Sequence, residues 1–376
     1  MTDTYRLYGG DISYYTGKAR AYLRYKDVPF EERVADRAVY KEIIVPRVGW
    51  PVIPVVITPE DETLQDTTDI IDALEQRFPE PAVYPEGPRQ HLVALLLECF
   101  GDEWLKIPAM HYRWNHNTDW IIREFGRLSR PDLSAEEQYE VGERTCRPFR
   151  GSLPALGVTA ATIPAVEASY EALLGELDAH FAVHPYLLGT RPSIGDFGLF
   201  GPLYAHQYRD PASGALMERL APNLVAWVKR MHEPAAEDRV RGGEFLADDA
   251  IPDTLLPVLR RMTDEYFPVL AATRTAFEAW AQAHPDEEVP RAIGMQPFTL
   301  GRGTPQEAQG ERAIFPFDLW MFQRPQRYLA GLEGAQRTAA EALLTAIDGL
   351  DVLSMPIGTP LARVNFRLQR APAASA

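Results

Sequence analysis

The pattern of hydrophobic and polar positions changes its period several times within the first 80 residues. Residues 5–8 predict a short strand, and the apolar positions from Tyr14 onward recur at i, i+4, i+7 and i+8, as on one face of a helix. Residues 28–34 and the β-branched run 51–58 predict two further strands, with a short helix between them. A very short strand and a helix capped by Asp66 follow. The predicted order is therefore βαβαββα.

The rest of the chain is predicted to be mainly helical. Helical periodicity is present near residues 90–127, 134–150, 164–182, 194–209, 222–233, 253–283 and 334–349. Residues 82–91 are predicted to be a linker. The segment 290–333 is rich in proline, glycine and aromatic residues, and it is expected to be irregular, either as a hairpin or as a long wrapping loop.

Composition and charge restrict the classes of partner. The net charge is −15, which disfavours a nucleic-acid backbone or an anionic membrane as a partner. No run of about 20 apolar residues is present, so no membrane span is expected. The two cysteines, Cys99 and Cys146, form neither a CxxC pair nor a disulfide framework, and a reducing cytoplasm is the expected location.

A proline that opens the third predicted strand indicates a thioredoxin-like plan. In that plan the bond before the proline is usually cis, which is a rare conformation. Here the proline is Pro54, and the backbone N–H and C=O of Ile53 would then face outward to form a short ladder with a bound peptide. The alternative is that Pro54 only occupies the edge of a strand.

Four segments together resemble the glutathione S-transferase superfamily. They are LYGGDISYYTGKARAYLRYKDVPFEE (7–32), VIPVV (52–56), LQDTTDIIDALE (64–75) and YLLGTRPSIGDFGLFGPLYA (186–205). In the last segment Ser193 is expected to cap a helix and Asp196 to reach back to it, as a structural motif. The four segments occur in the order and at the spacing of the family, and the resemblance covers roughly residues 5–233.

The resemblance implies an architecture and a cosubstrate. Residues 1–85 would form an α/β thioredoxin-like domain that binds glutathione, and residues 88–234 an all-α glutathione-transferase-like domain. Residues 235–376 exceed the usual family length and are expected to form a mainly helical extension with an irregular segment. The family usually forms homodimers, so a homodimer is expected here.

The family mechanism requires the thiolate of glutathione, because the thiolate is the nucleophile. A hydroxyl that donates to the sulfur at the start of the first helix would stabilise this anion. The run SYYTGKAR resembles that of the serine subfamilies, which makes Ser13 the leading candidate. Tyr14 and Tyr8 are the alternatives, and an ordinary helix cap is the competing role for Ser13.

The other glutathione contacts are expected at two places. Gln65, Asp66 and Thr67 would meet the γ-glutamyl end, with Asp66 pairing with its ammonium and the helix start receiving its carboxylate. Most relatives have Glu-Ser where this chain has Gln-Asp. Arg47 is expected to bind the glycine carboxylate, with Trp50 as a further donor in the same loop.

Aromatic residues in segment 102–120 suggest a place for a second substrate. Trp104, Tyr112 and Trp114 are expected either to line an apolar pocket between the domains or to belong to the core. No metal site is expected, because the five-residue spacing of His111 and His116 does not place both on one helical face.

Two functions remain open at this stage. The first is an enzyme that uses glutathione thiolate to attack an electrophilic, partly apolar small molecule, by transferase, lyase or isomerase chemistry. The second is a non-catalytic binding or scaffolding protein that keeps the glutathione-transferase fold. The extension and the Gln-Asp turn favour the second somewhat.

Overall fold

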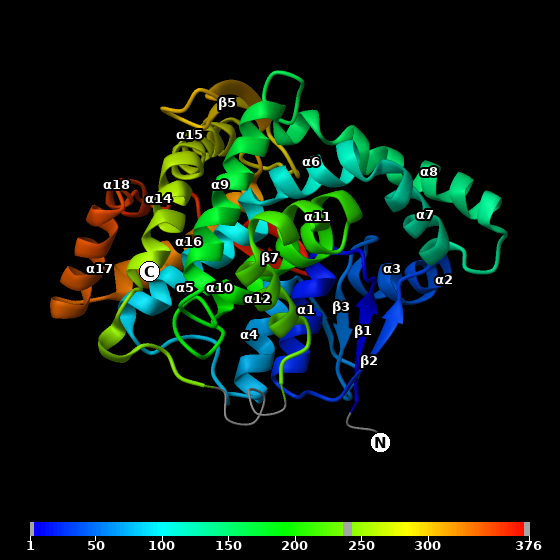
Figure 1. Ribbon diagram of the computed structural model, residues 1–376, viewed down its shortest axis with the longest axis horizontal. Helices are drawn as coiled ribbons and strands as arrows, with labels where there is room; N and C mark the ends of the chain where they lie inside the picture. The colour runs from blue at the N-terminus through cyan, green and yellow to red at the C-terminus, as the bar shows by residue number, and fades with distance from the viewer. Residues whose placement is uncertain (1–3, 236–242, 372–376) are drawn as a thin grey trace.

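A computed structural model describes residues 4–235 and 243–371 of the chain (Figure 1). The first part contains β1 (Tyr5–Gly9), α1 (Tyr14–Tyr25), β2 (Phe30–Val34), α2 (Arg37–Val39), η1 (Tyr40–Ile44), α3 (Val45–Val48), β3 (Val55–Ile57), β4 (Thr63–Gln65) and α4 (Thr67–Arg77). The sheet has the order β2-β1-β3-β4, with β2 parallel and β3 antiparallel to β1. The predicted βαβαββα order is confirmed, and with it the thioredoxin-like fold.

The helical part follows after a linker that ends at Gly87, earlier than the expected residue 91, because Pro88 suits the first position of a helix. Its elements are α5 (Pro88–Cys99), η2 (Phe100–Trp104), α6 (Lys106–His116), α7 (Thr118–Ser129), α8 (Ala135–Gly151), η3 (Pro154–Leu156), α9 (Ile163–Phe181), α10 (Ile194–Pro202), η4 (Leu203–Tyr208), α11 (Pro211–Leu220) and α12 (Pro222–His232). The segment predicted as one helical stretch over 90–127 is thus divided between several elements.

The expected capping motif at the start of α10 is present. The carboxylate of Asp196 accepts hydrogen bonds from the backbone N–H of Ser193 at 2.8 Å and from its hydroxyl at 2.9 Å. It also accepts from the N–H of Leu187 at 3.0 Å and from the indole of Trp227 at 3.1 Å. Asp196 is fully buried, and these four donors replace the hydrogen bonds to water that its carboxylate loses on burial.

The extension contains η5 (Ala247–Asp249), η6 (Asp253–Leu255), α14 (Leu256–Glu265), α15 (Phe267–Ala283), β5 (Met295–Leu300), β6 (Ala308–Ala313), α16 (Pro316–Gly331), α17 (Gly334–Ala346), α18 (Leu350–Leu353), β7 (Leu361–Val364) and β8 (Arg367–Arg370). Segment 290–333 forms the β5–β6 hairpin, but it also forms α16, where an irregular segment was expected. Pro316 starts this helix, and Pro325 lies inside it at the cost of one backbone hydrogen bond. Buried contacts of Leu319, Met321 and Phe322 offset that loss.

One hydrophobic core joins the three parts of the chain. A single cluster of buried residues includes Leu7 of β1, Leu97 of α5, Leu259 of α14 and Met321 of α16. The figure shows α1 and α4 between the sheet and the helical part, and the extension on the far side of α5 (Figure 1). No helix among the described residues is long and apolar enough to cross a membrane.

Candidate functional site

Ser13 occupies the start of α1, where the chain turns from the loop after β1 into the helix. Its side-chain oxygen accepts a hydrogen bond from the N–H of Thr16 at 3.2 Å, so the residue is the N-cap of α1. In that bond the oxygen is the acceptor, which leaves the hydroxyl hydrogen free to be donated to a bound sulfur. Ser13 is half-buried, whereas its neighbour Tyr14 is buried.

The two tyrosine alternatives are engaged elsewhere. The hydroxyl of Tyr14 donates to the carbonyl of Gly101 in η2, and burial, followed by the charge of Asp102, raises the pKa of Tyr14 well above its usual value. Tyr8 is 1% exposed and packs with Ile44 and other apolar side chains beneath the sheet. Of the three candidates, Ser13 is the one that is half-buried, and Tyr14 and Tyr8 are buried.

The loop before β3 provides outward-facing backbone and an unused donor. The Ile53–Pro54 bond is cis, as expected from the sequence. Trp50 lies in the same loop, and its buried indole N–H has no hydrogen-bond partner among residues 4–235 and 243–371. A buried donor without an acceptor is costly, so an acceptor supplied by a ligand would be favourable here.

The turn between β4 and α4 holds Asp66 in an unusual conformation. Asp66 has φ 76° and ψ 135°, and its carboxylate accepts from the N–H of Thr68 at 3.0 Å. A non-glycine residue in such a region costs about 1–3 kcal/mol, and strain of this kind is concentrated at functional sites. Gln65 and Thr67, on either side of Asp66, are buried.

Arg363 of β7 lies against this turn, and sequence analysis did not identify it. Its guanidinium forms ion pairs with Asp66 at 3.0 Å and with Asp69 at 2.9 Å. It also donates to the side-chain oxygen of Gln65, and to the Gln65 carbonyl at 3.3 Å. Burial, followed by the charge of Asp66, raises the pKa of Asp69 to about 6, against the opposing effect of Arg363. The extension therefore places a cation where the ammonium of glutathione was expected.

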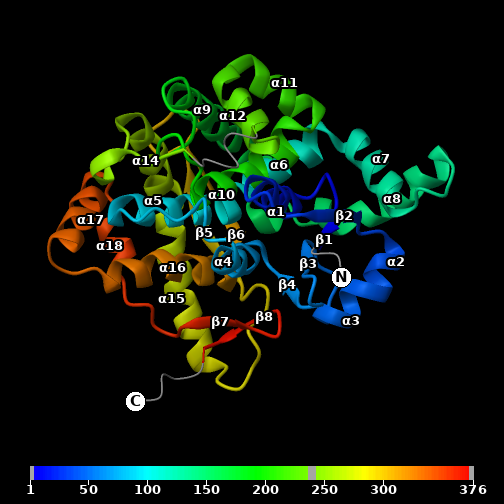
Figure 2. The ribbon, with the colours of Figure 1, turned by 90° about the horizontal axis from the view of Figure 1, so that it is seen from below.

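The tip of the β7–β8 hairpin covers the other end of the same surface. Phe366 packs against the apolar cluster that includes Trp50 and Ile53. The guanidinium of Arg367 lies 5.1 Å from the centre of the Trp50 ring and donates to the carbonyl of Gly49 at 3.3 Å. Figure 2 shows the hairpin beside β4 and α3. The hairpin thus extends over the positions expected for both ends of a glutathione molecule.

Arg47 lies in α3, in the segment before β3 where it was expected, and its guanidinium already has partners. Its guanidinium donates to the carboxylate of Asp61 at 2.7 Å and to the hydroxyl of Thr63 at 3.2 Å. These contacts hold the turn between β3 and β4. Of the two donors considered for the glycine carboxylate, the indole of Trp50 is therefore the one without a competing partner among the described residues.

Charged side chains are buried between α1 and the helical part. Lys18 is fully buried and forms ion pairs with Glu98 at 2.8 Å and Asp102 at 2.5 Å. Burial alone would lower the pKa of Lys18, but these two carboxylates raise it overall. Burial raises the pKa of Asp102 to about 7, although Lys18 opposes the shift. Removing one charge from such a group would leave the others unpaired and strongly destabilise the fold.

Arg324 of α16 ties the extension to this buried group. It forms ion pairs with Glu98 at 2.5 Å and Asp72 at 2.9 Å and donates to the hydroxyl of Tyr84 at 2.9 Å. Asp72 lies on α4, so Arg324 connects the thioredoxin-like unit, the helical part and the extension. Sequence reasoning missed this residue because no short motif surrounds it.

The three aromatic residues proposed as a pocket lie apart in the core. Trp104 stacks on Tyr266 at 5.2 Å, Tyr112 contacts Tyr170 at 5.1 Å and Trp114 packs on Phe125 and Phe149. Each is at most 5% exposed. That the three rings line one substrate pocket stays a prediction. In the structure, each ring has the surroundings of a core residue.

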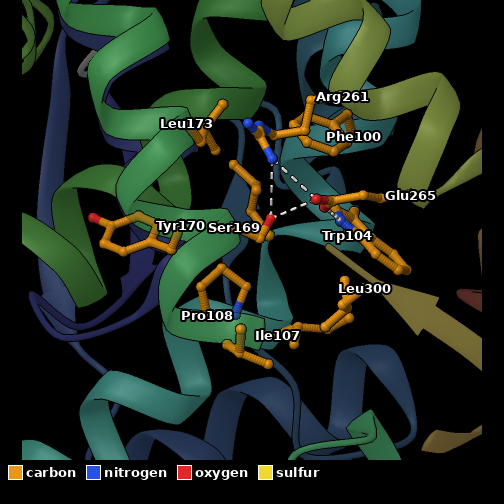
Figure 3. A pocket seen from close by; sticks show the side chains of 12 residues that line it. Phe100, Trp104, Ile107, Pro108, Ser169, Tyr170, Leu173, Arg261, Glu265 and Leu300 are labelled. Atoms are coloured by element: carbon orange, nitrogen blue, oxygen red, sulfur yellow. Dashed lines mark hydrogen bonds and ion pairs between the residues drawn. The ribbon is translucent and has the colours of Figure 1, made fainter. Parts of the chain in front are cut away.

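Trp104 does line one small cavity between α6, α9 and α14 (Figure 3). The cavity has a volume of about 20 Å³, which suits about one water molecule rather than a drug-sized ligand. At its edge Glu265 accepts from Ser169 at 2.6 Å, Arg261 at 3.0 Å and the Trp104 indole at 3.3 Å. These polar groups satisfy one another.

His111 and His116 meet, although their spacing was expected to separate them. Both imidazole Nε2 atoms lie 2.9 Å from the same carboxylate oxygen of Glu167 on α9. The ring centroids are 5.1 Å apart. The spacing argument failed because His116 is the last residue of α6, where the regular helix ends. The third residue, Glu167, comes from α9, and the local sequence could not reveal this contact.

The fold and the geometry around the cis-proline loop define a thioredoxin-like domain joined to a helical domain, and family comparison agrees. Residues 7–82 match the glutathione S-transferase N-terminal domain, and residues 160–230 match the glutathione S-transferase C-terminal domain. These two segments of the chain are therefore domains of the glutathione S-transferase superfamily. No curated protein matches the sequence.

Several solved structures are similar to the chain. The β-etherase LigF from a Sphingobium strain is 18% identical, covering 63% of this chain and 98% of its own, with a TM-score of 0.46. A Methylobacterium radiotolerans glutathione S-transferase in complex with glutathione sulfonate is 21% identical, covering 66% and 98%, with a TM-score of 0.37. A Rhodospirillum rubrum glutathione S-transferase is 16% identical, covering 66% and 96%, with a TM-score of 0.39. No substrate or activity follows from likeness at this level.

Proposed function

We propose that the protein binds glutathione along the cis-proline loop and the start of α4, and that it activates the thiol with Ser13. The single observation that carries the proposal is the strained Asp66 at the N-terminus of α4, directly after Gln65, which pairs with Val55 just beyond the cis Ile53–Pro54 bond. Asp66 would pair with the γ-glutamyl ammonium, and the first turn of α4 at Thr67 would receive the carboxylate.

The rest of glutathione has matching partners. The cysteinyl backbone would pair with the N–H and C=O of Ile53 ahead of Pro54, and the indole N–H of Trp50 would donate to the glycine carboxylate. The hydroxyl of Ser13 and the N-terminal dipole of α1 would then stabilise the thiolate. The thiol proton passes to solvent, and the thiolate sulfur forms a bond to an electrophilic carbon of a partly apolar small molecule. In a substitution the bond from that carbon to its leaving group breaks, and the leaving group departs with the electron pair. In an addition the π pair of a polarised double bond moves to the adjacent atom, which takes a proton from solvent.

Arg363 favours a second candidate function. Because its guanidinium already pairs with Asp66, Asp69 and Gln65, the chain fills the γ-glutamyl position with its own extension. A protein in which this contact is permanent would be a non-catalytic binding or scaffolding member of the family. A cytoplasmic location and a homodimer are proposed in either case.

The two functions differ in what happens to the thiol of added glutathione. Ultraviolet difference titration across pH should be carried out on the full chain and on Arg363→Ala, following thiolate absorbance. If the protein is an enzyme, we expect saturable binding of glutathione and a pKa of the bound thiol below about 8.5, at least in Arg363→Ala. Binding with an unshifted thiol would support the binding protein. No binding of millimolar glutathione to either form would overturn the glutathione site itself.

A further inference from the structure

The pair of histidines at the end of α6 faces a carboxylate of α9, on elements outside the thioredoxin-like unit. Nε2 of His111, Nε2 of His116 and a carboxylate oxygen of Glu167 all lie within 4.8 Å of one another. The two nitrogen-to-oxygen distances are both 2.9 Å and share one oxygen atom. We propose that these three side chains form a binding site for a divalent transition-metal ion of the zinc type.

The distances fit that ion with small movements. Zinc binds imidazole nitrogen at about 2.0–2.1 Å and carboxylate oxygen at about 2.0–2.2 Å, so tetrahedral ligand atoms lie roughly 3.3–3.4 Å apart. Opening each 2.9 Å contact by a few tenths of an ångström would admit the ion. Two imidazoles and one carboxylate leave a fourth position for water, as in zinc sites that are not purely structural.

A neighbouring amide can orient the first ligand. Nδ1 of His111 lies 2.8 Å from the side-chain nitrogen of Asn115. When Nε2 binds a metal, Nδ1 carries the proton, and rotation of the Asn115 amide by half a turn presents its oxygen as the acceptor. Partners of this kind fix the tautomer of metal-binding histidines. The side chains of His116 and Glu167 are 42% and 35% exposed, which gives an ion access from solvent.

The ion would link α6 to α9. The site uses none of the residues proposed to contact glutathione, and the inference does not depend on the proposed function. Two imidazole nitrogens select zinc, cobalt, nickel or copper over magnesium and calcium, which prefer oxygen ligands. Cobalt is therefore a suitable spectroscopic probe for the same position.

The test is a titration of the chelator-treated full-length protein with Co²⁺, followed by displacement with Zn²⁺. We expect one equivalent of Co²⁺ to give visible absorption that Zn²⁺ removes, and Glu167→Gln and His116→Asn to weaken Co²⁺ binding at least tenfold. Glu171→Gln is the matched control, since this exposed carboxylate lies one turn further along α9, and it should bind as the unaltered protein does.

Circular dichroism establishes whether the variants fold. If Glu167→Gln does not fold, the Co²⁺ affinity of His116→Asn, a variant of an exposed residue, is the test of the site. No visible absorption with excess Co²⁺, or an affinity unchanged in both variants, would overturn the site. An equal loss in the Glu171→Gln control would show a diffuse effect of surface charge and would also overturn it.

Discussion

The thioredoxin-like unit and the β7–β8 hairpin meet at one surface but are specified in different ways. The acidic start of α4 is visible in a few neighbouring residues, because Asp66 caps the helix that follows it. Its partner Arg363 is separated from it by 297 positions along the chain. The comparison shows that a helix start can be recognised from neighbouring residues while the side chain that contacts it comes from a segment far away along the chain.

The largest expected effect concerns a buried ion pair inside the extension, which joins β6 to α16. Arg312 and Asp318 are buried, lie 3.0 Å apart, and Arg312 also lies 5.5 Å from the centre of the Trp104 ring. Arg312→Ala would leave Asp318 buried without its charge partner, so the free energy of unfolding should fall by about 3–5 kcal/mol. Chemical denaturation measures this loss.

The double variant Arg312→Met with Asp318→Leu is the control, because it removes both charges together and should be much less destabilised than the single variant. A loss below about 1 kcal/mol in Arg312→Ala would mean that this ion pair between β6 and α16 contributes little to the stability of the fold.

The next effect concerns the contact of the helical part with the extension at His180. Its ring is buried between the hydroxyl of Thr254 at 2.9 Å and the carbonyl of Tyr186 at 3.2 Å. Burial lowers the pKa of His180 to about 4. Between pH 4 and 6.5 the unfolded chain therefore binds a proton that the folded chain does not, and this term makes stability rise with pH.

We expect His180→Gln to remove that term, which amounts to about 3 kcal/mol over the interval at 1.36 kcal/mol per pKa unit. Denaturation of both proteins at several pH values measures the stability difference between them, which should shrink as pH falls from 6.5 to 4. A difference that does not change with pH would contradict the neutral state of the buried ring.

A smaller effect is expected for Ser13→Ala. Losing a hydroxyl that donates to a thiolate costs about 1.5–3 kcal/mol, so the thiol pKa of bound glutathione should rise by about 1–2 units. The hydroxyl does not hold the tripeptide itself, so its dissociation constant should change by less than about threefold. Thiolate absorbance and calorimetry measure the two quantities. If Ser13→Ala weakened glutathione binding as much as it weakened thiolate stabilisation, Ser13 would be assigned to helix capping alone.

Local signals explain how much of this molecule the sequence predicts. The alternation in β1, the β-branched β3 and the capped α4 depend on neighbouring residues, and all three elements are predicted and present. The prolines of α16 resemble those of a loop, and only tertiary contacts keep that segment helical. No periodicity identifies the four-residue strands β7 and β8 as a pair, because such short strands owe their stability to the surface on which they pack.

The candidate site shows the same division. Family motifs predict Ser13 at the start of α1, Asp66 at the start of α4 and the cis bond at Pro54, and the structure has these three local features. The roles of Ser13 and Asp66 toward glutathione stay predictions. Arg363 and the meeting of His116 with Glu167 depend on the packing of distant helices and strands. No spacing rule reaches across such separations, and so the local sequence could not have identified them.

The most direct test of the hairpin's role is the glutathione dissociation constant of the full chain, measured by calorimetry beside Arg363→Ala and Arg370→Ala. Arg370 lies on the same hairpin but bonds to the carbonyls of His284 and Pro285, so its variant is the matched control. The guanidinium of Arg363 pairs with Asp66 and Gln65, the residues proposed to meet the γ-glutamyl end of glutathione. Arg363→Ala should therefore bind glutathione at least tenfold more tightly than the unaltered protein, and Arg370→Ala should not. Equal or weaker binding by Arg363→Ala would contradict competition between the hairpin and glutathione.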